Sequence, residues 1–207
     1  MPVLGLALFA IYGLLAFGVR MVVQVRRTGS TGFTGLRGAS GFVERIGGLL
    51  FAMAVVLCIA GPVLQQAGTL SSVEALDGEG ANILGVVLAS LGIVTTVVAQ
   101  FAMGDAWRIG VNPCERTELV THGPFSLVRN PIFAAMIPSF VGIALLAPNA
   151  VTITGAILLI AALELQTRLI EEPYLSTVHG EQYATYAAQV GRFLPGVGRL
   201  ALNLKQL

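Results

Sequence analysis

The sequence contains little charge. Only 11% of its 207 residues are Asp, Glu, Lys or Arg, whereas about a quarter of the residues in soluble domains are charged. Hydrophobic residues make up 55% of the chain, and its mean hydropathy is +0.81. The chain therefore lacks the polar surface of an ordinary soluble domain, and we expect an integral membrane protein.

Histidine and cysteine are scarce too, with two of each in the chain. Cys58 lies in an apolar stretch, Cys114 lies in a polar loop, and no CxxC spacing occurs, so we expect two unpaired thiols. The sequence has no HExxH motif and no Ser-His-Asp constellation, which leaves zinc chemistry and triad hydrolysis with little support. We expect no metal site and no nucleic-acid partner.

Long apolar runs are abundant instead. A helix that crosses a bilayer needs about 20 apolar residues, and four runs approach or exceed this length: residues 3–19, 46–64, 81–103 and 132–163. The last run is too long for one crossing, and Pro148 and Asn149 within it indicate a tight turn. We therefore expect an all-α bundle of about five transmembrane helices, the last two forming a hairpin.

The basic residues predict how this bundle is oriented. All twelve Lys and Arg residues lie between the first two spans, between the third and fourth, or after the fifth, whereas residues 65–80 carry only acidic charges. Basic residues near span ends are retained on the cytoplasmic side. We expect a protein of a bacterial cytoplasmic membrane, with its N-terminus outside and its C-terminus in the cytoplasm. No basic residue precedes the first run, so we expect a retained span and no signal peptide.

Two cytoplasmic loops carry distinctive patterns. Residues 29–41 read GSTGFTGLRGASG, with a glycine at every third position. This stretch lacks the GK[ST] of a phosphate-binding loop, so we expect a pliable loop whose function, if it has one, is to cover a site. In the second loop, residues 104–130, Trp107 and Arg108 directly follow the third span, where such side chains commonly anchor at the headgroup level.

The C-terminal tail combines charges with tyrosines. Arg168 and Glu172 have the four-residue spacing of a helical ion pair, which favours a solvated, salt-bridged helix. The adjacent carboxylates Glu171 and Glu172 also suggest a site that holds a cation or a zwitterion. A break at residues 179–180 precedes a helix over residues 181–190, whose two tyrosines we expect to pack the tail over this site.

Two stretches carry a family resemblance. ELVTHGPFSLVRNPIF, residues 118–133, is followed about 40 residues later by EEPYLSTVHGEQYATYAAQVGRFLP, residues 171–195. Together they resemble the C-terminal signature of the isoprenylcysteine carboxyl methyltransferase family, over residues 104–195. This resemblance implies an N-terminal three-span region, residues 1–103, and a catalytic region, residues 104–207.

The resemblance also implies a cofactor site and a reaction. S-adenosylmethionine would bind from the cytosol between the loop before the hairpin and the C-terminal helices, with Glu171 taking its ammonium group. Its methyl group would pass to an amphiphilic or lipid-like acceptor, including the carboxylate of a prenylated cysteine, leaving S-adenosylhomocysteine as product. The cofactor-binding residues implied are Thr117, Glu118, Leu119, Val120, Phe125, Asn130, Pro131, Ile132, Phe133 and Glu171.

The chain departs from the family pattern at three positions. Asn130 stands where the family has His, Phe133 where it has Tyr, and Thr167 where it has an Arg thought to hold the substrate carboxylate, with Arg168 one step on. One residue turns a helical side chain by about 100°, so Arg168 would face a different direction.

For the reaction itself we expect in-line displacement, with catalysis mostly by orientation and desolvation. Arg129 is the first choice for orienting or neutralising the acceptor and Arg168 the second, while Glu172 either aligns Arg168 or is solvated.

Two other functions remain open from the sequence. A sterol-reductase-like membrane enzyme would hold NADPH in a related C-terminal half, although no basic cluster for its 2′-phosphate is evident. A non-catalytic scaffold or small transporter is the other class, although transporters often show internal repeats or polar residues at mid-bilayer.

Overall fold

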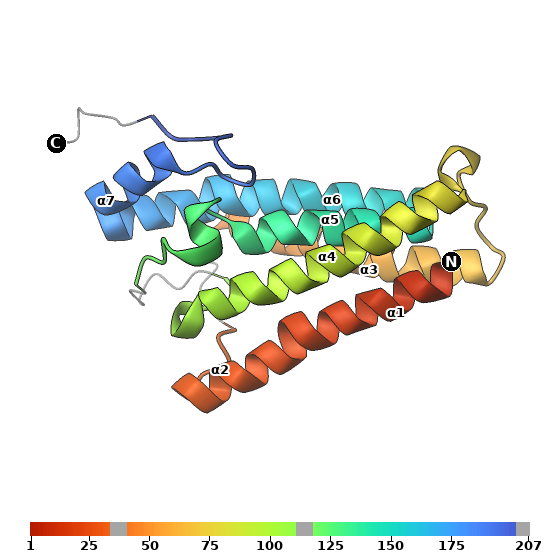
Figure 1. Cartoon of the computed structure of the whole chain (residues 1–207), viewed down its shortest axis with the longest axis horizontal. Helices are drawn as coiled ribbons and strands as arrows, with labels where there is room; N and C mark the ends of the chain where they lie inside the picture. Colours follow the sequence, from red (N-terminus) through yellow and green to blue (C-terminus); the bar gives the residue numbers. More distant parts are fainter. Residues whose placement is uncertain (34–40, 111–117, 202–207) are drawn as a thin grey trace.

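In the described part of the chain, the computed structural model contains five helical segments that run side by side along the length of the molecule (Figure 1). The structure describes residues 1–33, 41–110 and 118–201. Thr117, Cys114 and most of the glycine-rich loop lie outside the described residues. The long elements are α1 (Pro2–Gly13), η1 (Leu14–Val19), α2 (Arg20–Thr28), α3 (Phe42–Gln66), α4 (Glu79–Ala102), α5 (Pro131–Leu146), α6 (Ala150–Gln166), η6 (Thr167–Glu171) and α7 (Glu172–Gln189).

This arrangement confirms the expected all-α membrane bundle. Within the described residues, four helices are long and apolar enough to cross a membrane, namely Pro2–Thr28, Phe42–Gln66, Glu79–Ala102 and Ala150–Gln189, and Pro131–Leu146 is a shorter apolar helix. The division of the chain at residue 103 stays a prediction. The first helix runs nine residues beyond the expected span and ends where Gly29 adopts a left-handed φ of 74°, a conformation that closes helices at little cost for glycine.

The last helix is longer than a membrane requires. At 1.5 Å per residue the 40 residues from Ala150 to Gln189 extend about 60 Å, roughly twice the hydrocarbon thickness. Charged side chains begin at Glu164, so η6 and α7 lie beyond the apolar part of this helix. Gly180 kinks α7 with a φ of 51°, which confirms the expected break near residue 180.

Glycines let neighbouring helices approach closely. A Cβ atom on Gly142 of α5 would lie 2.5 Å from backbone atoms of Gly85 and Ala89 on α4. A Cβ atom on Gly155 of α6 would lie 2.7 Å from the sulfur of Cys58 on α3. Small residues at such crossings are the usual means by which membrane helices pack, and here they join α4 to α5 and α3 to α6.

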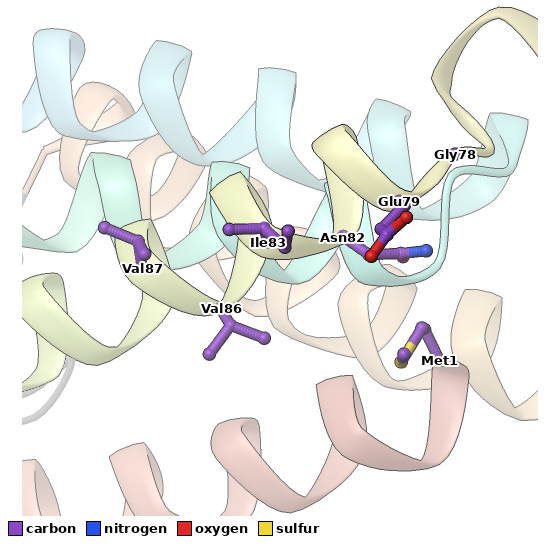
Figure 2. Close-up of a pocket in the computed structure, with 7 residues that line it drawn as sticks. All are labelled: Met1, Gly78, Glu79, Asn82, Ile83, Val86 and Val87. Carbon is purple, nitrogen blue, oxygen red and sulfur yellow. The ribbon is translucent and has the colours of Figure 1, made fainter.

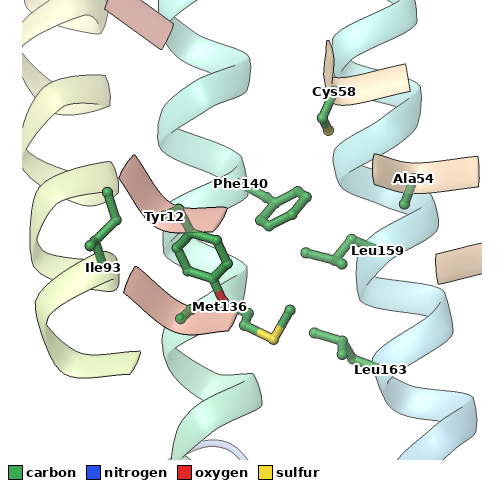
Figure 3. Close-up of a cluster of buried hydrophobic side chains, with 9 residues drawn as sticks. Tyr12, Ala54, Cys58, Ile93, Met136, Phe140, Leu159 and Leu163 are labelled. Atoms are coloured by element: carbon green, nitrogen blue, oxygen red, sulfur yellow. The ribbon is translucent and has the colours of Figure 1, made fainter. Parts of the chain in front are cut away.

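The centre of the bundle is filled by apolar side chains from all five helical segments (Figure 3). Tyr12 of α1 meets Phe140 of α5 edge to face, with ring centroids 6.0 Å apart, and Met136, Leu159 and Leu163 belong to the same cluster. The interior is therefore packed with side chains and positions the ends of α4, α5 and α6 relative to one another.

The two ends of the bundle differ in charge. Helices α2 and α7 lie at one end of the bundle, where α3 and α5 begin and α4 ends (Figure 1), and the described basic residues lie in or next to these parts of the chain. The N-terminus and the turn between α5 and α6 lie at the opposite end. In that turn the Asn149 side chain caps α6 by accepting hydrogen bonds from Val151 N and Thr152 N.

Trp107 corrects one sequence-based expectation. We expected an indole that anchors among the lipid headgroups, but only 2% of Trp107 is exposed, so its ring faces protein at that level. Its ring lies under the guanidinium of Arg20, with the Arg20 Cζ atom 4.6 Å from the ring centroid. Arg20 provides a cation–π partner inside the bundle, so the indole is buried among protein atoms instead of facing lipid headgroups.

Candidate active site

The C-terminal tail is tied to the beginning of α5 by backbone hydrogen bonds. Arg129 N donates to Gly191 O at 2.8 Å, and Asn130 N donates to Arg192 O at 3.1 Å. Pro131 follows as the first residue of α5, as expected, since proline lacks the N–H that would be unpaired there. Residues from the two family-like stretches, far apart in sequence, therefore meet at one corner of the bundle.

Glu172 lies between two guanidinium groups at this corner. Its Oε1 accepts from Arg129 Nη2 at 2.6 Å and from Arg192 Nε at 2.8 Å, and its Oε2 accepts from Arg192 Nη2 at 2.8 Å. All three residues are buried, with exposed fractions of 7%, 5% and 9% for Glu172, Arg129 and Arg192. We call these three residues the tail network.

The guanidinium of Arg129 is engaged on several sides. Its Nη1 donates to Ala187 O at 3.0 Å and also to Val190 O, while its Nη2 donates to Gly198 O at 3.0 Å in addition to Glu172. Hydrogen bonds from a charged group are stronger than neutral ones. Arg129 therefore fastens the end of α7 and the residues that follow it to the start of α5.

The electrostatics of the tail network favour charged side chains. Burial alone would raise the pKa of Glu172, but the hydrogen bonds from Arg192 and Arg129 outweigh it and lower the pKa. The pKa of Arg192 is raised, chiefly by its hydrogen bond with Glu172. A buried carboxylate that accepts from two cations is a strong structural clamp, because removing any partner leaves a buried charge unpaired.

Glu171 differs sharply from its neighbour. Its carboxylate accepts one long hydrogen bond, from Gln166 Nε2 at 3.4 Å, and among the described residues it forms no ion pair. Burial raises the pKa of Glu171 to about 7, and the nearby charge of Glu172 adds to this effect. An ammonium group of a ligand would supply the countercharge, so this residue fits the methionine end of S-adenosylmethionine.

Tyr183 and Tyr186 pack the tail against the loop before α5, as expected. Tyr186 donates its hydroxyl hydrogen bond to Phe125 O at 2.6 Å, and its ring meets that of Tyr183 edge to face at 6.3 Å. Burial raises the pKa of both hydroxyl groups to about 12. Phe125 itself is buried and lies in η5 (Gly123–Ser126), a turn that Gly123 permits with a φ of 60°.

Arg168 does not pair with Glu172, which corrects the expected ion pair. Arg168 binds Glu164 one turn earlier, and 56% of its side chain is exposed. The reason is local geometry: Thr167–Glu171 forms a π-helical turn, whose wider winding breaks the four-residue register. Glu172 is therefore neither solvated nor aligned with Arg168. Arg192, its second partner, was missed in the sequence because it lies twenty positions away, beyond the reach of helical spacing.

The remaining described residues that the resemblance implies for cofactor binding lie at the same end of the bundle. Glu118 is exposed, Leu119 and Val120 are half-buried, and Thr117 lies outside the described residues. Ile132 and Phe133 pack against the central apolar cluster. Phe125 and Asn130 are joined to the tail by hydrogen bonds, whereas no hydrogen bond or ion pair within the described chain connects residues 118–120 to Glu171.

A groove at the opposite end of the bundle is a different feature. It has a volume of about 540 Å³ and lies between the start of α1 and the first half of α4 (Figure 2). Its lining is mostly apolar and includes Met1, Ile83, Val86 and Val87. None of the residues implied for cofactor binding lines it, so it does not bear on the proposed cofactor site.

Comparison with protein families assigns the chemistry. Residues 81–182, from α4 into α7, match the family described as phospholipid methyltransferase, whose members use S-adenosylmethionine. Comparisons with curated proteins and with solved structures gave no match. The family match favours neither the reductase nor the scaffold alternative. Residues 81–182 therefore form a phospholipid methyltransferase family domain, which indicates an S-adenosylmethionine-dependent membrane methyltransferase.

Proposed function

We propose that this methyltransferase methylates a lipid-like acceptor at the cytoplasmic surface of the membrane, and that Glu171 holds the ammonium group of S-adenosylmethionine. The observation that carries the proposal is the carboxylate of Glu171, which has no basic partner among the described residues and a pKa raised to about 7. Its neighbour Glu172 has two such partners. Glu171 lacks a countercharge, whereas the charge of Glu172 beside it is neutralised. This difference favours Glu171 as the residue that binds a cation of the ligand.

The tail network gives Glu171 a fixed position. Glu172 follows Glu171 directly, and its ion pair with Arg129 holds the start of α7 against the residues that open α5. Arg129 is therefore proposed as a positioning residue, because its terminal nitrogens already bind Glu172 and the tail. Contact between Arg129 and the acceptor stays a prediction. Preorganised positions of this kind let a site work by orientation.

S-adenosylmethionine supplies an activated methyl group, which an acceptor nucleophile attacks in line while the bond to sulfur breaks. Phe125 and the residues Asn130 to Phe133, together with residues 117–120, are proposed to surround the cofactor. Half-buried side chains such as Phe133 would exclude water from it, since this residue packs on the apolar cluster. Desolvation of the reacting groups is the contribution that such a wall makes.

Two acceptor chemistries follow from different observations. The family match points to a phospholipid, in which an amine would lose a proton on methylation. The motif resemblance points to the carboxylate of a prenylated cysteine, which needs no proton removal. Arg168 remains a candidate acceptor contact, since its side chain is largely exposed where the last helix leaves the apolar region.

The test is transfer of a labelled methyl group from S-adenosylmethionine to defined acceptors in vesicles of phosphatidylglycerol. One set carries phosphatidylethanolamine and a second set a farnesylated cysteine. We expect transfer to at least one acceptor by the wild type and a loss of more than tenfold at limiting cofactor in Glu171→Gln, with Glu181→Gln, an exposed carboxylate on α7, unchanged. Equal rates in wild type and Glu171→Gln would contradict the role of Glu171.

A further inference from the structure

A row of buried residues that includes polar side chains lies between the first helix and α4, and we call it the polar seam. Tyr12, Ala16, Arg20 and Gln24 recur at every fourth residue, and each is at most 2% exposed, so they occupy one buried face of the helix. Across the seam, Gln100 of α4 donates from Nε2 to Ala16 O at 3.0 Å. The Oε1 atom of Gln100 is buried without a hydrogen-bond partner.

Arg20 is the charged residue of this seam, and its contacts are neutral. Its Nη1 donates to Gln24 Oε1 at 2.8 Å and its Nη2 to Gly104 O at 2.5 Å. Its guanidinium stacks on two rings, with Cζ 5.4 Å from the centroid of Phe101 and 4.6 Å from that of Trp107. Its Nε is buried without a partner.

No carboxylate within the described residues pairs with Arg20. The nearest acidic candidate, Asp105, forms its ion pair with Arg27 at 3.2 Å and offers only its backbone oxygen to Gln24. A buried cation without a countercharge is costly. Ionisable residues within membrane helices mark functional sites by default, and Arg20 follows directly on a π-helical turn, a feature frequent at such sites.

The depth of Arg20 matches that of lipid headgroups. It follows the apolar residues 3–19, which extend about 26 Å along a helix, close to the hydrocarbon thickness of about 30 Å. Its side chain is 1% exposed and contacts α4 and the residues after it, so it does not simply reach outward to the lipid surface. Gly123 of η5 lies near the same end of α4, since a Cβ atom on it would be 3.9 Å from the Cβ atom of Ala102.

We propose that Arg20 binds the phosphate of the lipid acceptor and so anchors its headgroup beside the cofactor site. A planar guanidinium is the preferred partner of phosphate, and its Nε–H and Nη2–H groups can bind two phosphate oxygens together once Nη2 leaves the Gly104 carbonyl. The inference rests on the proposed function, because it takes the ligand to be the methyl acceptor. Arg20 lies outside the family-matched residues 81–182, so the family match gives this residue no role.

The fluorescence of Trp107 can report ligand binding at Arg20. Trp107 is the single tryptophan and stacks on the Arg20 guanidinium, so an anion bound there should change its fluorescence. We would titrate the full chain in detergent with short-chain phosphatidylethanolamine, with diacylglycerol of the same chains, and with inorganic phosphate. We expect a saturable change with the phospholipid, none with diacylglycerol, and phosphate binding at least tenfold weaker than the lipid.

Variants separate the ligand contact from a structural role. Arg20→Gln should weaken phospholipid binding at least tenfold, and Arg20→Lys should weaken it less. Arg26→Gln removes the same charge from an exposed position of the same helix and should titrate like the wild type. Binding of S-adenosylhomocysteine serves as the folding control. If Arg20→Gln does not bind this ligand, the test uses Arg20→Lys instead. Phospholipid binding by Arg20→Lys equal to that of the wild type would then overturn the proposal.

The remaining outcomes distinguish the two proposals. An Arg20→Gln chain that is folded and titrates like the wild type would overturn the phosphate site, as would an equal response to diacylglycerol. Inorganic phosphate that binds as tightly as the phospholipid would overturn its assignment to a lipid headgroup. A wild type that binds the phospholipid through Arg20 but does not bind S-adenosylhomocysteine would contradict the proposed function and leave the anion site standing.

Discussion

Two buried arginines have opposite surroundings at the same end of this bundle. Arg129, in the tail network, is bonded to a carboxylate that a second arginine shares, whereas Arg20, in the seam, contacts carbonyl, amide and aromatic groups and has no carboxylate partner among the described residues. The adjacent carboxylates show the same contrast: Glu172 is bonded to two arginines, whereas Glu171 has no basic partner among the described residues. This contrast underlies our proposals that the paired charges hold the fold and that Glu171 and Arg20 bind ligands.

The largest effect should follow from breaking the tail network. Glu172→Gln leaves two buried guanidinium groups without a carboxylate, and loss of one member of a buried ion pair costs about 3–5 kcal/mol. We expect a large fall in the thermal unfolding temperature in detergent. Glu164→Gln removes an exposed pair with Arg168, worth at most about 1 kcal/mol. Similar unfolding temperatures for the two variants would contradict the structural role of the network.

The pH dependence of cofactor binding should sharpen the contrast between the two carboxylates. Burial raises the pKa of Glu171 to about 7, so as the pH falls below this value a growing fraction is protonated and must lose its proton to bind an ammonium group. The affinity for S-adenosylhomocysteine should therefore fall as the pH is lowered from about 7 to about 5, by up to tenfold per unit. Calorimetry across this range checks it, and Glu171→Gln should show no such slope. A wild-type affinity that is flat with pH would count against Glu171.

We expect a smaller loss of stability from breaking the uncharged contact between the C-terminal tail and the loop before α5. Tyr186→Phe removes the hydrogen bond to Phe125 O but keeps the ring, and a neutral hydrogen bond contributes about 1 kcal/mol. We expect a modest fall in unfolding temperature, measured by the same thermal assay. A fall for Tyr186→Phe as large as that for Glu172→Gln would remove the distinction between charged and neutral contacts.

The sequence predicted the bundle well because hydrophobic length and turn residues act locally. Pro148 and Asn149 divided the last apolar run correctly, and Pro131 marked the start of α5. The two family-like stretches meet at one corner of the bundle, and a cofactor site there stays a prediction. These features depend on a few neighbouring residues, so a single chain is enough to reveal them.

The hydrogen-bond and ion-pair partners of individual side chains were harder to predict, because these partners lie far away in the sequence. The spacing of Arg168 and Glu172 favoured an ion pair, but the π-helical turn between them turned Glu172 toward Arg129 and Arg192. Arg20 looked like one of several basic residues that follow the first span. Its burial arises from Gln24, Trp107 and Gly104, which lie along one face or across the bundle, and no local pattern distinguishes it from exposed Arg26.

The most direct test is calorimetric binding of S-adenosylhomocysteine to wild type, Glu171→Gln and Glu181→Gln in detergent. The central claim is that the unpaired carboxylate of Glu171 holds the ligand cation. We predict saturable binding that Glu171→Gln weakens by more than tenfold, about 1.4 kcal/mol, at an unchanged unfolding temperature, with Glu181→Gln equal to wild type. Affinity for Glu171→Gln equal to that of the wild type would contradict the claim.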